Sequence, residues 1–165
     1  MESEKKLTYN LQPGFIFMSK EHVTVQTVLG SCVSVCIWDK VSQFGGLNHY
    51  IYPLVRERDK ALPIYGNVAV ITLLRMMEEA GSRPENMIAY IIGGADPVGA
   101  ENNLGEQNYK LAKRVLKHCK IKIVSEDVGG SMGRKILYDN RSGQLAVLKV
   151  HNLRKSDWYS LKEDR

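Results

Sequence analysis

A cysteine and a histidine, Cys32 and His49, stand 17 positions apart and have the side chains needed for nucleophilic and proton-transfer chemistry. A free thiol has a pKa of about 8.5 and is mostly protonated at neutral pH. A neighbouring imidazole can take the thiol proton, hold the thiolate in an ion pair, and later protonate a departing amine. The two residue types therefore predict hydrolysis of an amide through a covalent sulfur intermediate.

Two short extended segments are predicted to bring this pair together in an antiparallel hairpin. With Asp39–Ser42 as a four-residue turn, Trp38 pairs with Gln43, and Cys32 then lies directly opposite His49. Opposed residues on one face of such a pair have Cβ atoms about 4.5–5.5 Å apart. The spacing alone leaves a second interpretation open, in which the thiol and the imidazole are ordinary core residues.

The residues just before the nucleophile are candidates for binding a developing oxyanion. Gly30 allows a tight turn, so backbone N–H groups at Gly30 and Ser31, near the sulfur of Cys32, can point at the oxyanion. The other cysteines, Cys36 and Cys119, are interpreted as packing residues. No second ligand pair has the spacing of a structural zinc site, so zinc binding is only a weak alternative and no metal is predicted.

The elements that position these residues follow from hydrophobic periodicity. A helix is predicted from Asn67 to Ala80, and a second from Asn103 to Cys119, where Asn103 and Glu106 have the spacing of a capping box. Extended segments are predicted at residues 15–18, 22–29, 32–38, 47–52, 87–92 and 121–128, with a hairpin over 134–138 and 145–150. The pattern is that of a β-rich α+β domain with two helices packed on sheet.

Composition excludes several classes of protein. The chain has 165 residues, of which 44% are hydrophobic, and this fits a single domain. Residues 1–10 and 152–165 are expected to be flexible tails. No apolar run is long enough to span a bilayer and no signal peptide is visible, so a cytoplasmic protein is expected. Apart from one helix face, the basic residues behind the net charge of +5 are spread along the chain and do not form the clusters of a nucleic-acid binder.

The segments around Cys32 and His49 resemble those of a known family. Residues 27–36 read TVLGSCVSVC and residues 46–49 read GLNH. Further similarity lies in GGA at 93–95, LGEQN at 104–108, DVGG at 127–130 and GR at 133–134. Over roughly residues 13 to 150 the chain resembles the CheD chemoreceptor glutamine deamidases.

This resemblance implies a reaction and roles for particular residues. The chain would hydrolyse selected glutamine side chains of chemoreceptor cytoplasmic domains to glutamate, with release of ammonia and without a cofactor. Cys32 matches the family nucleophile and His49 the family histidine. The family also uses a threonine shortly before the cysteine to support the histidine. Thr27 is the nearest candidate for that role, whereas an offset of one residue would place Gln26 there.

The resemblance also implies a fold and a partner. The family fold is similar to the catalytic domain of the cytotoxic necrotizing factors, which has a β-sandwich core flanked by helices (α/β/β). Members bind and stimulate CheC, an aspartyl-phosphate phosphatase, so such a partner is expected in addition to the receptor substrate. A basic helix face at Lys110, Lys113, Arg114 and Lys117 is either a solvated surface or a site for an acidic partner.

Three alternative functions remain. The domain can act as a non-enzymatic regulator that binds the phosphatase, although intact Cys32 and His49 argue against that as its sole role. The same thioester can be intercepted by an amine, as in a crosslinking transglutaminase. A nucleotide site at Gly93–Gly99 ranks last, because its spacing is not GxGxxG and Pro97 interrupts it.

Overall fold

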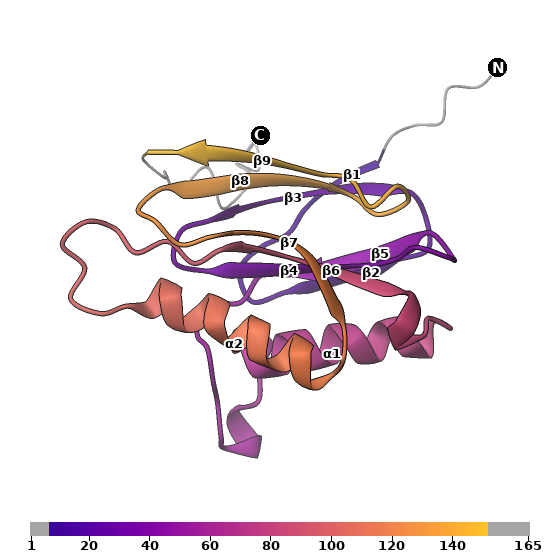
Figure 1. Ribbon diagram of the computed structural model, residues 1–165, viewed down its shortest axis with the longest axis horizontal. Coiled ribbons are helices and arrows are strands. Elements are labelled where there is room, and N and C mark those ends of the chain that lie inside the picture. Colours follow the sequence, from indigo (N-terminus) through magenta and orange to yellow (C-terminus); the bar gives the residue numbers. More distant parts are fainter. Residues whose placement is uncertain (1–6, 152–165) are drawn as a thin grey trace, which may run out of the picture.

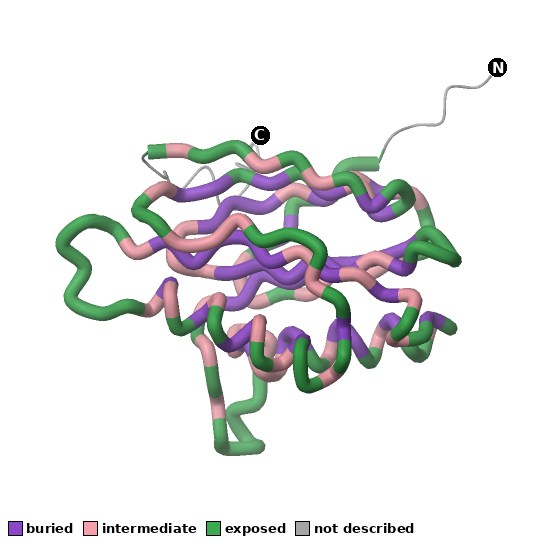
Figure 2. Tube along the Cα trace, in the orientation of Figure 1, coloured by how far each residue is buried: buried purple, intermediate pink, exposed green. Residues whose placement is uncertain are grey.

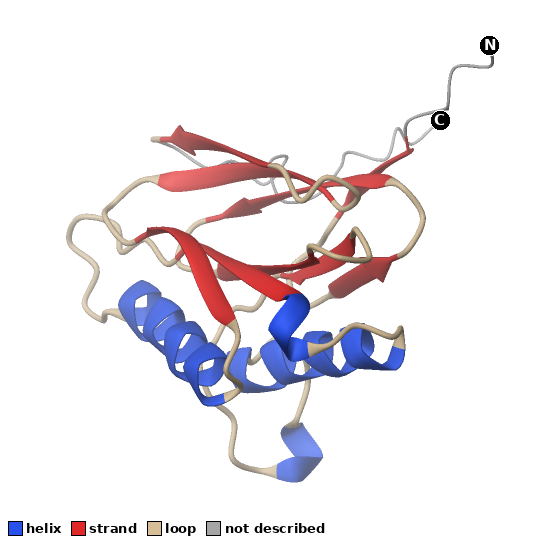
Figure 3. Cartoon of the chain, turned by 45° about the vertical axis from the view of Figure 1, so that its right-hand side comes forward, coloured by secondary structure: helices blue, strands red, loops and turns tan. Residues whose placement is uncertain are grey.

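The computed structural model describes residues 7–151, which form three stacked layers (Figure 1). Within this range two β-sheets lie face to face, and α1 and α2 cover the free face of one of them (Figures 1 and 3). The predicted α+β class is therefore confirmed. No helix in these residues combines the length and the apolar character needed to cross a membrane.

The sheet farther from the helices, called here the outer sheet, has the strand order β1-β3-β8-β9. The β1–β3 pair is parallel, and the other two pairs are antiparallel. Its strands are β1 (Leu7–Asn10), β3 (Val23–Leu29), β8 (Gly133–Asp139) and β9 (Leu145–Val150).

The sheet next to the helices, called here the central sheet, has the order β2-β5-β4-β6-β7. Only its β6–β7 pair is parallel. Its strands are β2 (Ile16–Ser19), β4 (Val33–Asp39), β5 (Phe44–Asn48), β6 (Met87–Gly93) and β7 (Lys122–Val128). The helices are α1 (Gly66–Glu79) and α2 (Leu104–His118), with two 3-10 turns at η1 (Arg58–Lys60) and η2 (Pro84–Asn86).

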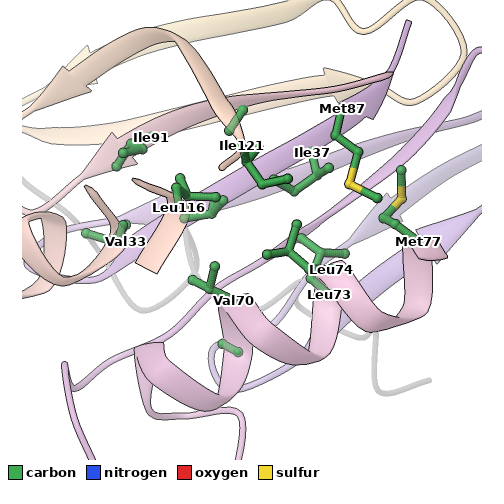
Figure 4. Close-up of a cluster of buried hydrophobic side chains, with 14 of the residues drawn as sticks. Val33, Ile37, Val70, Leu73, Leu74, Met77, Met87, Ile91, Leu116 and Ile121 are labelled. Carbon is green, nitrogen blue, oxygen red and sulfur yellow. The ribbon is translucent and has the colours of Figure 1, made fainter. Parts of the chain in front are cut away.

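Two hydrophobic cores hold the three layers together. One lies between the sheets and includes Val25 and Leu29 of β3, together with Cys36 and Leu47 of the central sheet. The other lies between the central sheet and the helices, where the helical spacing predicted the buried face of α1. Figure 4 shows this core and labels ten of its side chains: Val33, Ile37, Val70, Leu73, Leu74, Met77, Met87, Ile91, Leu116 and Ile121. Figure 2 shows burial concentrated in the strands and on the inner helix faces.

The N-terminal boundary differs from the prediction. Leu7–Asn10, expected to belong to a flexible tail, form β1 and pair in parallel with β3. The sequence pattern missed this strand because all four of its residues are exposed, so no buried alternation marks it. The rest of the two predicted tails, residues 1–6 and 152–165, lies outside the described residues.

The β4–β5 hairpin is two residues away from the predicted register. Trp38 pairs with Gly45 rather than with Gln43. The reason is the turn: Asp39 stays in β4, and its Oδ1 accepts two backbone N–H groups of the turn, each at 2.8 Å. Gln43 then takes a left-handed conformation with φ of 57° and donates its N–H to the Asp39 carbonyl. The turn thus begins one residue later and ends one residue later than expected.

The N-terminus of α2 is not closed by the predicted capping box. Asn103 occupies the N-cap position but makes no side-chain capping bond. The carboxylate of Asp96 does so from the preceding loop, with Oδ1 2.8 Å from the Gly105 nitrogen and Oδ2 3.1 Å from the Glu106 nitrogen. A Cβ on Gly105 would meet the Gly94 oxygen at 2.4 Å, so this helix end packs directly on the loop that follows β6.

Candidate active site

A hydrogen bond joins the two sheets at the edge of the inter-sheet core. Thr27, on the face of β3 that turns toward the central sheet, has its Oγ1 2.7 Å from Nδ1 of His49, which directly follows β5. Side chains of β3 alternate between the two faces of the outer sheet, and Thr27 lies on the buried face with an exposed fraction of 5%. Gln26 points the other way and bonds Asn10 on the exposed side. Of the two candidates for the third position, Thr27 contacts the histidine.

The same contact fixes the tautomer of His49. The hydroxyl of Thr27 has one proton, which it donates to the Leu11 carbonyl at 2.8 Å. It must therefore accept at the other contact, and Nδ1 of His49 is the donor. In a neutral ring this leaves the lone pair on Nε2. Nε2 is buried and has no hydrogen-bond partner among residues 7–151, so it is free to act as a base.

Cys32 and His49 lie on either side of a backbone bridge. Val33 and Tyr50 exchange hydrogen bonds of 3.1 and 3.0 Å. In this register Cys32 lies diagonal to His49 and not directly opposite it, so the predicted pairing is wrong by two residues. A shift of two keeps each side chain on its face of the sheet. Diagonal neighbours have Cα atoms about 7–8 Å apart, with Cβ atoms somewhat closer.

The two side chains differ in their access to solvent. Cys32 is partly exposed and packs against the edge of the inter-sheet core. His49 is 0% exposed. A substrate must therefore approach from the side of the sulfur, with the imidazole behind it. A cavity of about 900 Å³ between β6, β7, β8 and β9 is lined by none of the predicted site residues, so it offers no route to the thiol.

Burial acts on both groups in the direction that keeps them neutral. Loss of water raises the pKa of the Cys32 thiol to about 11, although its own backbone N–H opposes the rise. Burial lowers the pKa of His49 to about 3. The free protein at neutral pH therefore holds a thiol beside a neutral imidazole. Both shifts oppose the ion pair expected from the residue types.

The loop that carries the nucleophile is held by its carbonyl groups. The oxygens of Gly30 and Cys32 accept hydrogen bonds of 3.0 and 2.9 Å from the backbone nitrogens of Ala95 and Gly94. The oxygen of Ser31, between them, accepts one from a side chain of α2 at 2.8 Å. The N–H groups of the same three residues donate to no carbonyl within the described part of the chain.

That side chain is Asn108, which is 0% exposed. The residue types did not predict any role for it beyond its place in the LGEQN segment. A signal was nevertheless present, because Asn108 falls on the apolar face of α2, in line with Leu104, Leu111 and Ala112. A polar residue on the buried face of an amphipathic helix needs partners, and these proved to be backbone carbonyls near the site.

The remaining predicted residues behave as packing or surface groups. Cys36 is fully buried in the inter-sheet core, and Cys119 caps α2 and packs against the other core, as expected. On the basic face of α2, Lys110 pairs with Glu106 at 2.5 Å and Lys113 with Glu126 at 3.3 Å. Two of its four cations are thus paired with carboxylates of the same chain.

Comparison with known proteins decides the family. The sequence matches the family described as CheD chemotactic sensory transduction over residues 55–149. A protein of Sulfurimonas denitrificans, named probable chemoreceptor glutamine deamidase CheD, is 41% identical over 154 residues, which are 91% of this chain and 97% of that protein. The chain belongs to the CheD family.

Two more CheD relatives support the assignment. Probable chemoreceptor glutamine deamidase CheD 1 of Anaeromyxobacter dehalogenans is 40% identical over 143 residues, covering 85% of this chain and 83% of that protein. The CheD of Trichlorobacter lovleyi is 38% identical over 138 residues, covering 82% and 86%. The family expected from the sequence motifs is thus confirmed. The matched CheD segment contains Asn108 and begins after Cys32 and His49.

Proposed function

We propose that this CheD-family chain deamidates glutamine side chains of methyl-accepting chemoreceptors to glutamate, in the cytoplasm, with Cys32 as nucleophile and His49 as its proton-transfer partner. The names of its relatives support the substrate class. The observation that carries the catalytic roles is the state of His49. Its Nδ1–H is bound to Thr27, and its buried Nε2 is unpartnered within the described residues, on the same sheet face as Cys32.

The acylation half of the reaction follows from two neutral groups. The sulfur attacks the carboxamide carbon as the thiol proton moves to Nε2 of His49, so no thiolate has to be stored beforehand. The imidazolium then gives this proton to the amide nitrogen. The C–N bond breaks, ammonia leaves, and a thioester joins the former glutamine side chain to Cys32. Thr27 accepts from Nδ1–H throughout and stabilises the charged ring.

Deacylation reverses the proton movements. A water molecule attacks the thioester carbon and gives a proton to Nε2, and that proton returns to the departing sulfur. The products are a glutamate side chain and a regenerated thiol. Each receptor thereby gains one negative charge and one carboxylate that can accept a methyl group.

The tetrahedral intermediates of both halves carry an oxyanion. The backbone N–H groups of Gly30, Ser31 and Cys32 are its proposed donors. The carbonyls of Gly30 and Ser31 share peptide planes with the N–H groups of Ser31 and Cys32, and both are engaged on other partners, which would hold these two planes fixed. Losing a single donor of this kind costs about 10²–10³ in kcat in other enzymes.

The test is an assay on a receptor cytoplasmic fragment. Ammonia release and the amide-to-acid mass change of receptor peptides are followed for the wild type, Cys32→Ala and His49→Ala. The proposal predicts both signals with the wild type and neither with Cys32→Ala, while circular dichroism shows that the fold is kept. Equal activity of the three proteins would refute the assigned site. Added lysine-like amines test the crosslinking alternative, which predicts amine incorporated at the same glutamines.

Binding of a CheC-type phosphatase stays a prediction, as does the likeness of the fold to the cytotoxic necrotizing factor catalytic domains. Cys32→Ala separates the enzymatic from the regulatory role. If the variant still stimulates such a phosphatase while receptor deamidation is lost, both functions reside in one domain. If stimulation occurs and even the wild type never deamidates receptors, the non-enzymatic alternative is correct.

A further inference from the structure

Asn108 connects the two segments that carry the proposed catalytic pair. From the first turns of α2, its Nδ2 donates to the carbonyl of Ser31 at 2.8 Å and to the carbonyl of Ile51 at 2.9 Å. Ser31 directly precedes Cys32, and Ile51 lies two residues after His49. One amide group thus uses both of its protons to tie the nucleophile loop to the histidine segment.

A third hydrogen bond, accepted by the backbone of the same residue, strengthens this connection. The hydroxyl of Tyr50, next to His49, donates to the backbone carbonyl of Asn108 at 2.6 Å. Asn108 is 0% exposed, so water cannot replace these bonds. The position of α2 is itself fixed by Asp96 at its N-terminus. The helix therefore acts as a rigid support for both segments.

The side chain of Asn108 is only partly satisfied. Its Oδ1 is buried and has no hydrogen-bond partner among the described residues. An unpaired buried acceptor costs about 1–3 kcal/mol, a cost that the two donated hydrogen bonds must outweigh. An apolar residue would fill the same space without that cost but would leave both carbonyls unbound. The two donated bonds are thus what an asparagine supplies here.

We infer that Asn108 is a positioning residue for the proposed deamidation: through the carbonyls of Ser31 and Ile51 it sets the spacing between the Cys32 sulfur and the His49 ring. This inference rests on the proposed function. Asn108 acts without touching the substrate, because its contacts are with backbone on the protein side of the loop. Misplacement of reacting groups by about 1 Å can cost about 10²-fold in rate.

The chain contains a matched control in the other helix. Asn67 of α1 also ties a helix to a loop, with Nδ2 donating to the Val55 carbonyl at 2.8 Å and Oδ1 accepting the Val55 nitrogen at 3.2 Å. None of these atoms belongs to the proposed site. Asn67→Ala therefore reports what the loss of a helix-to-loop tie does to stability alone.

The experiment measures kcat and KM for deamidation of a receptor fragment, together with thermal unfolding. Asn108→Ala should lower kcat about 100-fold with KM within threefold of wild type. Asn67→Ala should keep kcat within twofold. In a His49→Ala background, Asn108→Ala should cost at most about tenfold more, because the sulfur–imidazole spacing is already lost and only the hold on the Ser31–Cys32 peptide plane remains to be lost. Asn108→Ser, which can bond one carbonyl at a time, should stay folded if Asn108→Ala does not, and lose about tenfold.

Two outcomes would overturn the inference. One is a kcat of either Asn108 variant within threefold of wild type, and the other is an equal loss in the wild-type and His49→Ala backgrounds. A wild type that releases no ammonia would instead refute the proposed function. The rate of Cys32 alkylation by iodoacetamide then decides the positioning role on its own. Freeing the Ser31 carbonyl should expose the thiol and speed its alkylation at least threefold, and an unchanged rate contradicts the role.

Discussion

The Thr27 hydroxyl lies 2.7 Å from Nδ1 of His49, although Thr27 belongs to the outer sheet and His49 follows a strand of the central one. The hydroxyl proton is already committed to the Leu11 carbonyl. The orientation of the imidazole therefore depends on how the two sheets pack. The Thr27–His49 hydrogen bond spans the two sheets and is therefore present only in the folded protein. Variants at these residues can thus be tested for both activity and stability.

Replacing Thr27 with valine removes the acceptor of Nδ1–H while keeping the shape of the side chain. We expect kcat for deamidation to fall about 10- to 100-fold, with KM little changed, because the ring loses its fixed tautomer. The free energy of unfolding should fall by about 1–3 kcal/mol, since the Leu11 carbonyl and Nδ1 are both left unpaired. Thr27→Ser should recover most of the activity, and an inactive serine variant would argue against the hydroxyl as the functional group.

The reactivity of Cys32 should depend on pH as that of a buried neutral thiol. With a pKa raised to about 11 by burial, its thiolate fraction grows about tenfold per pH unit below that value. Alkylation by iodoacetamide should therefore keep rising from pH 6 to pH 9. Peptide mapping separates Cys32 from the partly exposed Cys119, with Cys32→Ala as the control. A plateau of high reactivity that begins near pH 6 would indicate a resting ion pair instead.

The stability of the fold should fall in acid because His49 is buried in its neutral form. Its pKa is about 3 in the folded protein and about 6.5 when unfolded, so the unfolded chain binds one more proton between these values. Stability contributed by this group is present above about pH 6.5 and falls by up to about 1.4 kcal/mol per pH unit below it. Urea unfolding of wild type and His49→Gln from pH 7 to pH 4.5 tests this. The variant should lose less stability, and parallel curves would contradict the prediction.

The carboxylate of Asp96 should stabilise the protein through α2. Asp96→Ala leaves the N–H groups of Gly105 and Glu106 without their acceptor, which typically costs about 1 kcal/mol. Urea unfolding measures the loss. Glu101→Ala, an exposed carboxylate of the same loop, is the matched control and should change stability by less than about 0.5 kcal/mol. Equal effects of the two variants would show that general loop charge, and not capping, is responsible.

Much of the fold could be predicted because its elements bury one face each. The spacing of Val70, Leu73, Leu74 and Met77 gave α1 its length to within a few residues. The alternation of β3 also explains why Thr27, and not Gln26, meets the histidine. The register of the hairpin could not be predicted in the same way, because it depends on which residue closes the turn. The Asp39 carboxylate determines which residue closes the turn, because it accepts two backbone N–H groups there. Such a contact produces no periodic pattern of hydrophobic residues in the sequence.

Candidate residues could be predicted from the sequence where the residue type itself provides a reactive group. They could not be predicted where a residue acts through contacts with backbone carbonyls. Cys32 and His49 are reactive side chains, so they could be singled out as candidates from residue type and spacing. Asn108 was not found, because its contacts are with carbonyls of residues 77 and 57 positions away. Contacts of that kind arise only when α2 packs on the central sheet, which is a tertiary event.

The most direct measurement of the central claim is the capture of the acyl-enzyme. Wild-type protein is mixed with a receptor fragment, quenched in acid within the first turnover and digested for mass spectrometry. The account predicts a receptor peptide joined to the peptide that contains Cys32, through a bond that neutral hydroxylamine cleaves, and none with Cys32→Ala. Ammonia released by wild type at full rate with no such adduct, and equally by Cys32→Ala, would contradict it.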